Sequence, residues 1–216
     1  ASGLVATGRA DTLDALDWIG VARGGDDKGG GGLPLRRIDV SADRLLLLGA
    51  AYPDTRLQVA PEAGGSGVQL QGPALAGSVH VPEADGAAIT GRFDRVHWQT
   101  AGVPTQAPTA ADTASGSDVD PAKVPPLSLE VADFRYGGAP LGTASLRTEP
   151  VAGGLRIVRL QTRAPAHRLD VHGDWTGRGA AARTHVVLDI DSDDFGALIA
   201  GFGYGGQLSR ATSPSP

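Results

Sequence analysis

The residues best suited to acid–base or metal chemistry are clustered in one short segment of the chain. This segment contains His167, Asp170, His172 and Asp174. Imidazole and carboxylate groups in such a cluster can bind a metal ion or exchange protons. On a β-strand, however, Asp170, His172 and Asp174 share one face, and the residues between them face the other way. We therefore interpret these three polar residues as the solvent-facing side of a half-buried strand.

Four aspartates further along the chain resemble a calcium-binding loop but have the wrong spacing. They are Asp189, Asp191, Asp193 and Asp194. An EF-hand loop needs Gly at its sixth position and Glu at its twelfth, and counting from Asp189 places Asp194 and Ala200 there. We interpret Asp189 and Asp191 as outward-facing strand residues, and Asp193 or the residue before it as the N-cap of a helix. Asp194 then lies in the positively polarised first turn of that helix.

The remaining motifs do not predict catalysis or nucleotide binding. Residues 201–206 satisfy G-x-G-x-x-G, but they follow a helical stretch instead of connecting a strand to a helix. Lys28 lies in a glycine run, but Gly29 stands where a phosphate-binding loop needs Ser or Thr. No Gly-x-Ser-x-Gly elbow is present, and three histidines are isolated: His80, His97 and His185. The sequence therefore predicts no catalytic residue, no metal site and no cofactor.

Composition excludes several further classes of function. The net charge is −5 and only 20% of the 216 residues are charged, so no basic surface for nucleic acid is expected. There is no Cys, which excludes disulfides and thiolate chemistry. There is also no Met, so we expect the sequence to be a piece of a longer or processed chain. No apolar run has the length of a membrane span, and any membrane anchor is expected outside this sequence.

Most of the chain has the alternation of short antiparallel strands. The 32 Gly and 15 Pro residues punctuate apolar–polar runs from Leu33 to Trp98 and again from Pro125 onward. Before them, Leu4–Ala10 reads as a strand and Asp11–Gly20 as a short helix with Leu13 on its apolar side. Residues 23–32 read as a glycine-rich loop.

The second half of the sequence weakly repeats the first. IDVSADRLLLLG near Ile38 resembles LEVADFRYGGAPLG near Leu129, and TRLQVAPEAGG resembles ASLRTEPVAGG. We predict a first repeat with an N-terminal helix at 1–103, a Pro/Ala/Ser-rich linker at 104–124, a second repeat ending in a helix at 125–210, and a tail at 211–216. The predicted fold is mainly β: an extended, curved antiparallel sheet that forms a groove, built from two related repeats with short helices.

One apolar face is the remaining candidate for function. Alternation places nine apolar side chains on one side of the second repeat: Leu129, Val131, Leu155, Ile157, Leu169, Val171, Val186, Leu188 and Ile190. Such a face either packs under a second layer as a core or is left open as a ligand groove, and the periodicity is the same in both cases.

Three ordered segments resemble the YhdP-type branch of the AsmA-like family. They are GRADTLDALDWIG at Gly8–Gly20, GPALAGSVHVPEADGAAITGRFDRVHW at Gly72–Trp98, and PPLSLEVADFRYGGAPLGTASLRTEPVAGGLRIVRLQTRAPAHRLDVHGDWTG at Pro125–Gly177. SDDFGALIAGFGYGG follows the third segment. The Gly-rich loop and the linker depart from the family pattern.

The resemblance implies a function as well as a fold. Family members are anchored in the Gram-negative inner membrane and extend through the periplasm as a long curved sheet with an apolar groove. They are implicated in phospholipid transport toward the outer membrane, and they are not known as enzymes. The resemblance thus implies a late periplasmic segment whose nine apolar residues contact phospholipid acyl chains, with other envelope proteins as further partners.

Two other hypotheses stay open at this stage. The chain is alternatively a structural or protein-interaction β domain of the cell envelope with a fully covered apolar core. A hydrolase acting on envelope material is the third hypothesis, and no convergent acid, base or nucleophile supports it.

Overall fold

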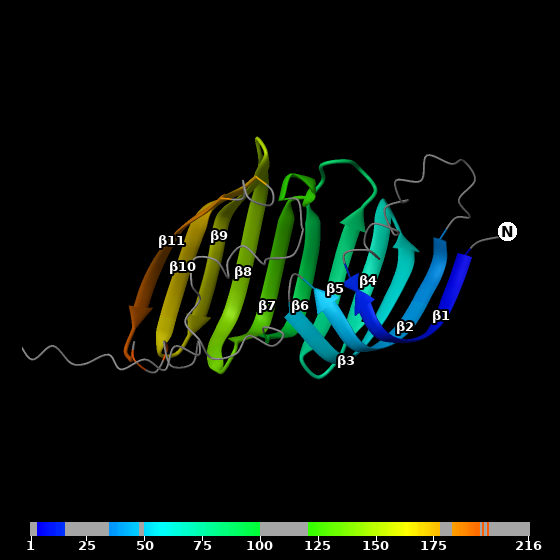
Figure 1. Ribbon diagram of the computed structural model, residues 1–216, viewed down its shortest axis with the longest axis horizontal. Helices are drawn as coiled ribbons and strands as arrows, with labels where there is room; N and C mark the ends of the chain where they lie inside the picture. The colour runs from blue at the N-terminus through cyan, green and yellow to red at the C-terminus, as the bar shows by residue number, and fades with distance from the viewer. Residues whose placement is uncertain are drawn as a thin grey trace, which may run out of the picture.

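The computed structural model describes residues 4–15, 35–47, 50–99, 121–177, 183–194, 196 and 198. These residues form an 11-stranded sheet in which the spatial order of the strands follows the chain. The strands are β1 (Leu4–Asp14), β2 (Leu35–Leu47), β3 (Ala50–Glu62), β4 (Gly65–Gln71), β5 (Leu75–Pro82), β6 (Ile89–Trp98), β7 (Leu127–Tyr136), β8 (Ala139–Val151), β9 (Gly154–Ala164), β10 (His167–Thr176) and β11 (Arg183–Ser192). A single 3₁₀ turn, η2 (Pro121–Lys123), precedes β7 within the described residues. The mainly β, curved, open sheet confirms the predicted fold class (Figure 1).

Two of the strand pairings are parallel instead of antiparallel. β1 pairs with β2, and β6 with β7, in parallel register, whereas the other neighbours are antiparallel hairpin partners. A parallel pair needs a long crossover connection, and residues 99–126 connect β6 to β7. Each parallel pairing is followed by five antiparallel strands, β2–β6 and then β7–β11.

The predicted helix at Asp11–Gly20 is wrong over its first four residues, which extend β1. Leu13 pairs with Leu45 of β2 and is buried. Ala10 and Leu13 both face inward, so their helix-like spacing comes from a break in strand alternation, and pairing with β2 outweighs local propensity. Ala15, the next residue, is helical and buried, as predicted. Residues 16–20, the glycine-rich loop, Lys28, most of the linker, residues 201–206 and the tail lie outside the described residues.

The same break in alternation recurs along the sheet and coincides with its bend. On β2, Ala42 and Leu45 both face inward while residues 43–44 between them are exposed. Across the second parallel pairing, Val131 and Phe134 of β7 repeat the pattern. In each case two residues instead of one separate the inward-facing pair. An extra residue in a strand bends it and increases its twist, and here it also keeps the same face apolar beyond the bend.

Two residues with positive φ mark the bend. Asp54 of β3 has a φ of 43° and Gly142 of β8 a φ of 73°. At Gly142 the register with β9 shifts, and a Cβ atom there would overlap the carbonyl oxygen of Arg163. Glycine is required at Gly142 for both reasons, since it tolerates this φ and leaves room for the neighbouring backbone.

Candidate functional site

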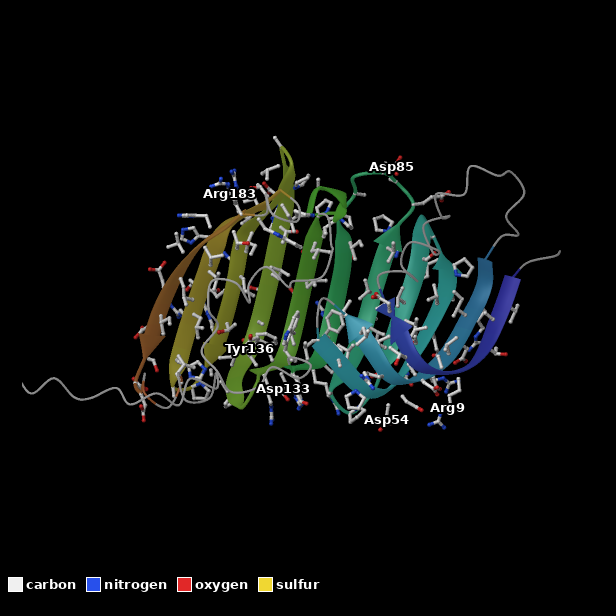
Figure 2. The ribbon with its side chains drawn as sticks, in the orientation of Figure 1. Arg9, Asp54, Asp85, Asp133, Tyr136 and Arg183 are labelled. Atoms are coloured by element: carbon white, nitrogen blue, oxygen red, sulfur yellow. The ribbon has the colours of Figure 1, made fainter. Side chains whose placement is uncertain are left out.

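One face of the sheet is lined mainly by apolar side chains, and we call it the apolar face. Alternation and strand register assign the described residues to this face. Those of the first half include Ile38, Val59, Val68 and Val79, and those of the second half include Leu129, Leu146 and Leu160. Among the strand residues whose side chains the structure describes, the register places no Asp, Glu, Lys or Arg on this side. It is the concave face, because β3 contacts β6, three strands away, across it. In Figure 2, Tyr136 lies within the curve, whereas Arg9, Asp54 and Asp133 project from its outer side.

The outer face is polar and holds ion pairs between neighbouring strands. Arg56 binds Asp39 through two nitrogens, each 2.7 Å from a carboxylate oxygen, and Gln58 donates a further hydrogen bond to Asp39. Hydrogen bonds from Arg56 and Gln58 lower the pKa of Asp39 to about 2. Arg9 and Asp43 link β1 to β2.

The second parallel pairing is also linked by charge. The Arg92 guanidinium lies 3.0 Å from Glu130, and His97 Nε2 lies 2.7 Å from Asp133. The hydrogen bond with His97 and a weaker one from Arg135 lower the pKa of Asp133. These exposed pairs fix the register of β6 against β7, and they leave the ionised groups on the outer face.

The residues first considered for acid–base chemistry lie on the outer face or at the edge of the apolar face. Asp170 accepts a hydrogen bond from Gln161 at 2.7 Å, and Asp174 accepts one from Arg156 at 2.7 Å. His172 is exposed between them. Among the described residues, no three His, Asp or Glu side chains are grouped as metal ligands would be. Asp170, His172 and Asp174 occupy the solvent-facing side of β10, as the alternation predicts. His167 lies on the same side as Leu169, and its Nε2 atom is buried without a hydrogen-bond partner.

The nine residues predicted from the sequence all lie on the apolar face, in register across β7, β9, β10 and β11. Gly173 of β10 lies between Ile157 and Val186, and Leu169 lies beside Ile190. Their exposure differs. Leu155 and Leu169 are buried, Val186 and Leu188 are 46% and 49% exposed, and the remaining five are half-buried.

A row of five side chains, which we call the central row, crosses the second half in register. It consists of Leu129, Leu146, Leu160, Val171 and Leu188. Leu146 and Leu160 were missed by the sequence analysis. Leu160 is out of phase with Leu155 and Ile157 because the register slips near Val158. The resumed alternation Arg159–Leu160–Gln161–Thr162 is the signal that identifies it.

Two covers flank the central row. On one side, η2 contacts β9 and β10, and Pro121 is fully buried. On the other side, Leu198 packs with Ala139, Leu141 and Leu169 and is 4% exposed. The Leu198 amide donates to the Asp194 carbonyl oxygen at 3.2 Å, the bond of a helical turn where the sequence predicts a helix. The central row lies between these two covers.

The apolar face also contains buried hydroxyl groups. Tyr52 Oη and Thr162 Oγ1 are buried without a hydrogen-bond partner. Burial raises the pKa of Tyr52, which keeps that group neutral. The face thus carries neutral polar groups but presents no fixed charge to a bound molecule.

Comparison with protein-family models identifies the chain. A family model described as YhdP protein matches residues 1–213. The chain belongs to the YhdP protein family. No curated protein and no solved structure matches it. The YhdP-family match covers both halves of the sheet, including the strands that carry the central row. None of the helical segments in the described part of this YhdP-family chain has the length and hydrophobicity of a membrane span.

Proposed function

We propose that this chain is a non-enzymatic periplasmic segment of a lipid transport protein, and that phospholipid acyl chains lie on its apolar face. The observation that carries the proposal is the central row. It is an uncharged, in-register line of five aliphatic side chains whose members are half-buried or exposed. Membership of the YhdP protein family agrees with lipid transport in the cell envelope.

The dimensions of the central row support an acyl chain as its ligand. Adjacent strands are about 4.8 Å apart, so the row is about 19 Å long, which is roughly the length of an extended sixteen-carbon acyl chain. Each methylene transferred from water to such a surface contributes about 0.8 kcal/mol, and no specific polar contact is needed. An acyl chain that slides along the central row therefore exchanges its contact with one aliphatic side chain for a contact with the next.

We further propose that the full protein is anchored in the inner membrane of a Gram-negative bacterium and moves phospholipid toward the outer membrane. In the same proposal, residues 1–103 and 125–210 are related repeats. The repeat proposal is supported by strand order: β2–β6 and β7–β11 are both runs of five antiparallel strands, and a parallel pairing precedes each run.

A structural or protein-interaction domain is the second candidate, and one observation favours it. Leu198 already covers Leu169 and part of β8, so the apolar face is partly closed by the chain itself. If a partner protein covers the rest of this face, no lipid will bind to it.

Lipid extraction followed by mass spectrometry separates the two candidates. The purified protein is expected to carry phospholipid, and Leu188→Gln is expected to reduce the bound amount several-fold. The matched control is Val187→Gln, because Val187 is a neighbouring exposed apolar residue on the outer face. Absence of lipid from the wild-type protein, or equal loss in both variants, would contradict the proposed groove.

A further inference from the structure

The central row continues into the first half of the sheet. Leu129 is in register with Gly91, Gly91 with Val79, and Val79 with Val68. The same line reaches Val59 and then Ile38 of β2. Ile38 is fully buried, and the line continues from it to the half-buried Ala6 of the edge strand β1.

A cavity lies over this continuation. Its volume is about 130 Å³, and every lining residue that the structure describes is apolar. The cavity is lined by Ala15, Leu47, Leu57, Val59, Val68, Leu70, Val79, Ile89, Phe93, Val124, Pro125, Leu127 and Leu129. A cavity with such a lining holds no water well, because a buried water needs two to four polar partners.

The segment before β7 forms part of the cavity wall. Val124 and Pro125 line the cavity, and the residues around them are fixed by backbone hydrogen bonds. The Ile89 amide donates to the Pro126 carbonyl oxygen at 2.8 Å, and the Leu127 amide donates to Thr148 Oγ1 at 2.9 Å. The cavity wall is thus built by β2–β7 together with this anchored segment.

Leu129 connects the cavity with the open part of the apolar face. It lines the cavity and is also the first member of the central row. Next to it, Gly91 has no side chain, and Leu129, Phe93 and Val79 lean into the space where a Cβ atom would lie. A flexible apolar chain lying on the central row would therefore meet no polar group between Leu188 and the cavity.

We propose that this cavity binds the terminal methyl end of an acyl chain whose remainder lies on the central row. The cavity, whose wall is formed by residues of β2–β7, then holds the chain end while the rest of the chain stays on the open part of the apolar face. This inference rests on the proposed function. A cavity of about 150 Å³ with a similar lining binds a six-carbon benzene ring, so this one accommodates roughly five carbons of the chain.

The test uses two photoreactive fatty acids and the purified protein. Both are palmitic acid analogues with a diazirine, placed at the terminal carbon in one and next to the carboxylate in the other. The terminal probe is expected to label Val68, Leu70 or Phe93, and the carboxylate-proximal probe to label β9–β11. Labelling of β9–β11 by both probes would contradict the cavity proposal while supporting the proposed groove. Absence of labelling by either probe would contradict the proposed function itself.

Filling the cavity provides an independent test. Val79→Phe is expected to shorten the preferred fatty acid by roughly two carbons, because the larger ring occupies part of the cavity. Native mass spectrometry with saturated fatty acids of graded length measures this preference. Val187→Phe on the outer face is the matched control and should keep the wild-type preference.

If Val79→Phe does not fold, Val68→Ile adds a single methylene to the same wall and is expected to give a smaller shift in the same direction. An unchanged length preference in a folded cavity variant would overturn the proposal.

Discussion

The two halves of the sheet bury the same apolar face to different extents. In the first half, fifteen described residues of β1–β6 and Ala15 form one buried cluster, and Ile38, Leu45 and Tyr52 are fully buried. In the second half the corresponding cluster has three residues of β7–β11 together with Leu198, and Val186 and Leu188 are nearly half exposed. The inner face is apolar in both halves, so the difference comes from curvature. The first half curls until β3 contacts β6, whereas the second half stays open between its two covers.

This contrast suggests a division of roles within one sheet. The first half obtains its stability from a packed core, whereas the second half leaves apolar surface exposed, which is costly for a protein without a ligand or partner. A repeated strand pattern thus gives a core or a groove depending on how far the sheet closes on itself.

The largest expected effect is the loss of a fully buried leucine in the first half. Leu45→Ala should lower the free energy of unfolding by about 3 kcal/mol, because it removes packing and leaves a cavity. Leu188→Ala, the same change in the second half, should cost less than about 1 kcal/mol. Urea denaturation measures both variants, and equal losses would refute the contrast between the halves.

The bend of the second half provides the next largest effect. Gly142→Ala combines an unfavourable φ with overlap on the Arg163 carbonyl, and should cost about 3 kcal/mol. Gly153→Ala is the matched control, because Gly153 has the same φ of 73° but no atom near the added Cβ, and it should cost about 1 kcal/mol. If the two variants are equally stable, the close approach of β8 and β9 does not shape the bend.

A smaller, pH-dependent effect is expected from the outer face of the first half. The pKa of Asp39 is about 2 in the folded protein and near 3.8 when unfolded, so its contribution is full above about pH 4. Asp39→Asn should therefore be less stable than wild type at pH 7, and the difference should disappear as the pH falls from about 4 to 2. Denaturation midpoints across this pH range measure it. Asp85→Asn, on the exposed turn after β5, is the control and should follow the wild-type curve (Figure 2).

The smallest expected effect on stability comes from the open face. Leu188→Gln and Val187→Gln should each change the free energy of unfolding by less than about 0.5 kcal/mol, because both residues are substantially exposed. Fluorescence of an apolar dye should fall for Leu188→Gln and stay constant for Val187→Gln. Equal dye binding by the two variants would mean that the central row is not the accessible apolar surface.

The sequence predicts the strands and the apolar side of the second half well, because alternation with period two is a local property. The nine predicted residues share one face for this reason. Leu160 was missed because a register slip near Val158 changes the phase of β9, and such slips depend on the neighbouring strand. Leu146 keeps the phase of β8, but its neighbours on the same face, Ala144 and Thr148, give only a weak apolar signal.

Features that depend on distant contacts were not predictable from the sequence. Asp11–Asp14 have helix-like spacing, and only pairing with β2 shows that they are strand. Sequence alternation also does not distinguish the buried Ile38 from the exposed Leu188, since apolar residues recur at every second position around both of them. The curl that separates core from groove arises from contacts such as those of β3 with β6, far apart in the chain.

Site-specific photo-crosslinking on β11 tests the central claim most directly. A photoreactive amino acid replaces either Leu188 or Val187, two adjacent exposed residues on opposite faces of the same strand. The account predicts crosslinks to phospholipid from position 188 and none above background from position 187. Equal crosslinking from both positions, or none from position 188, would contradict an acyl-chain groove on the inner face of the second half.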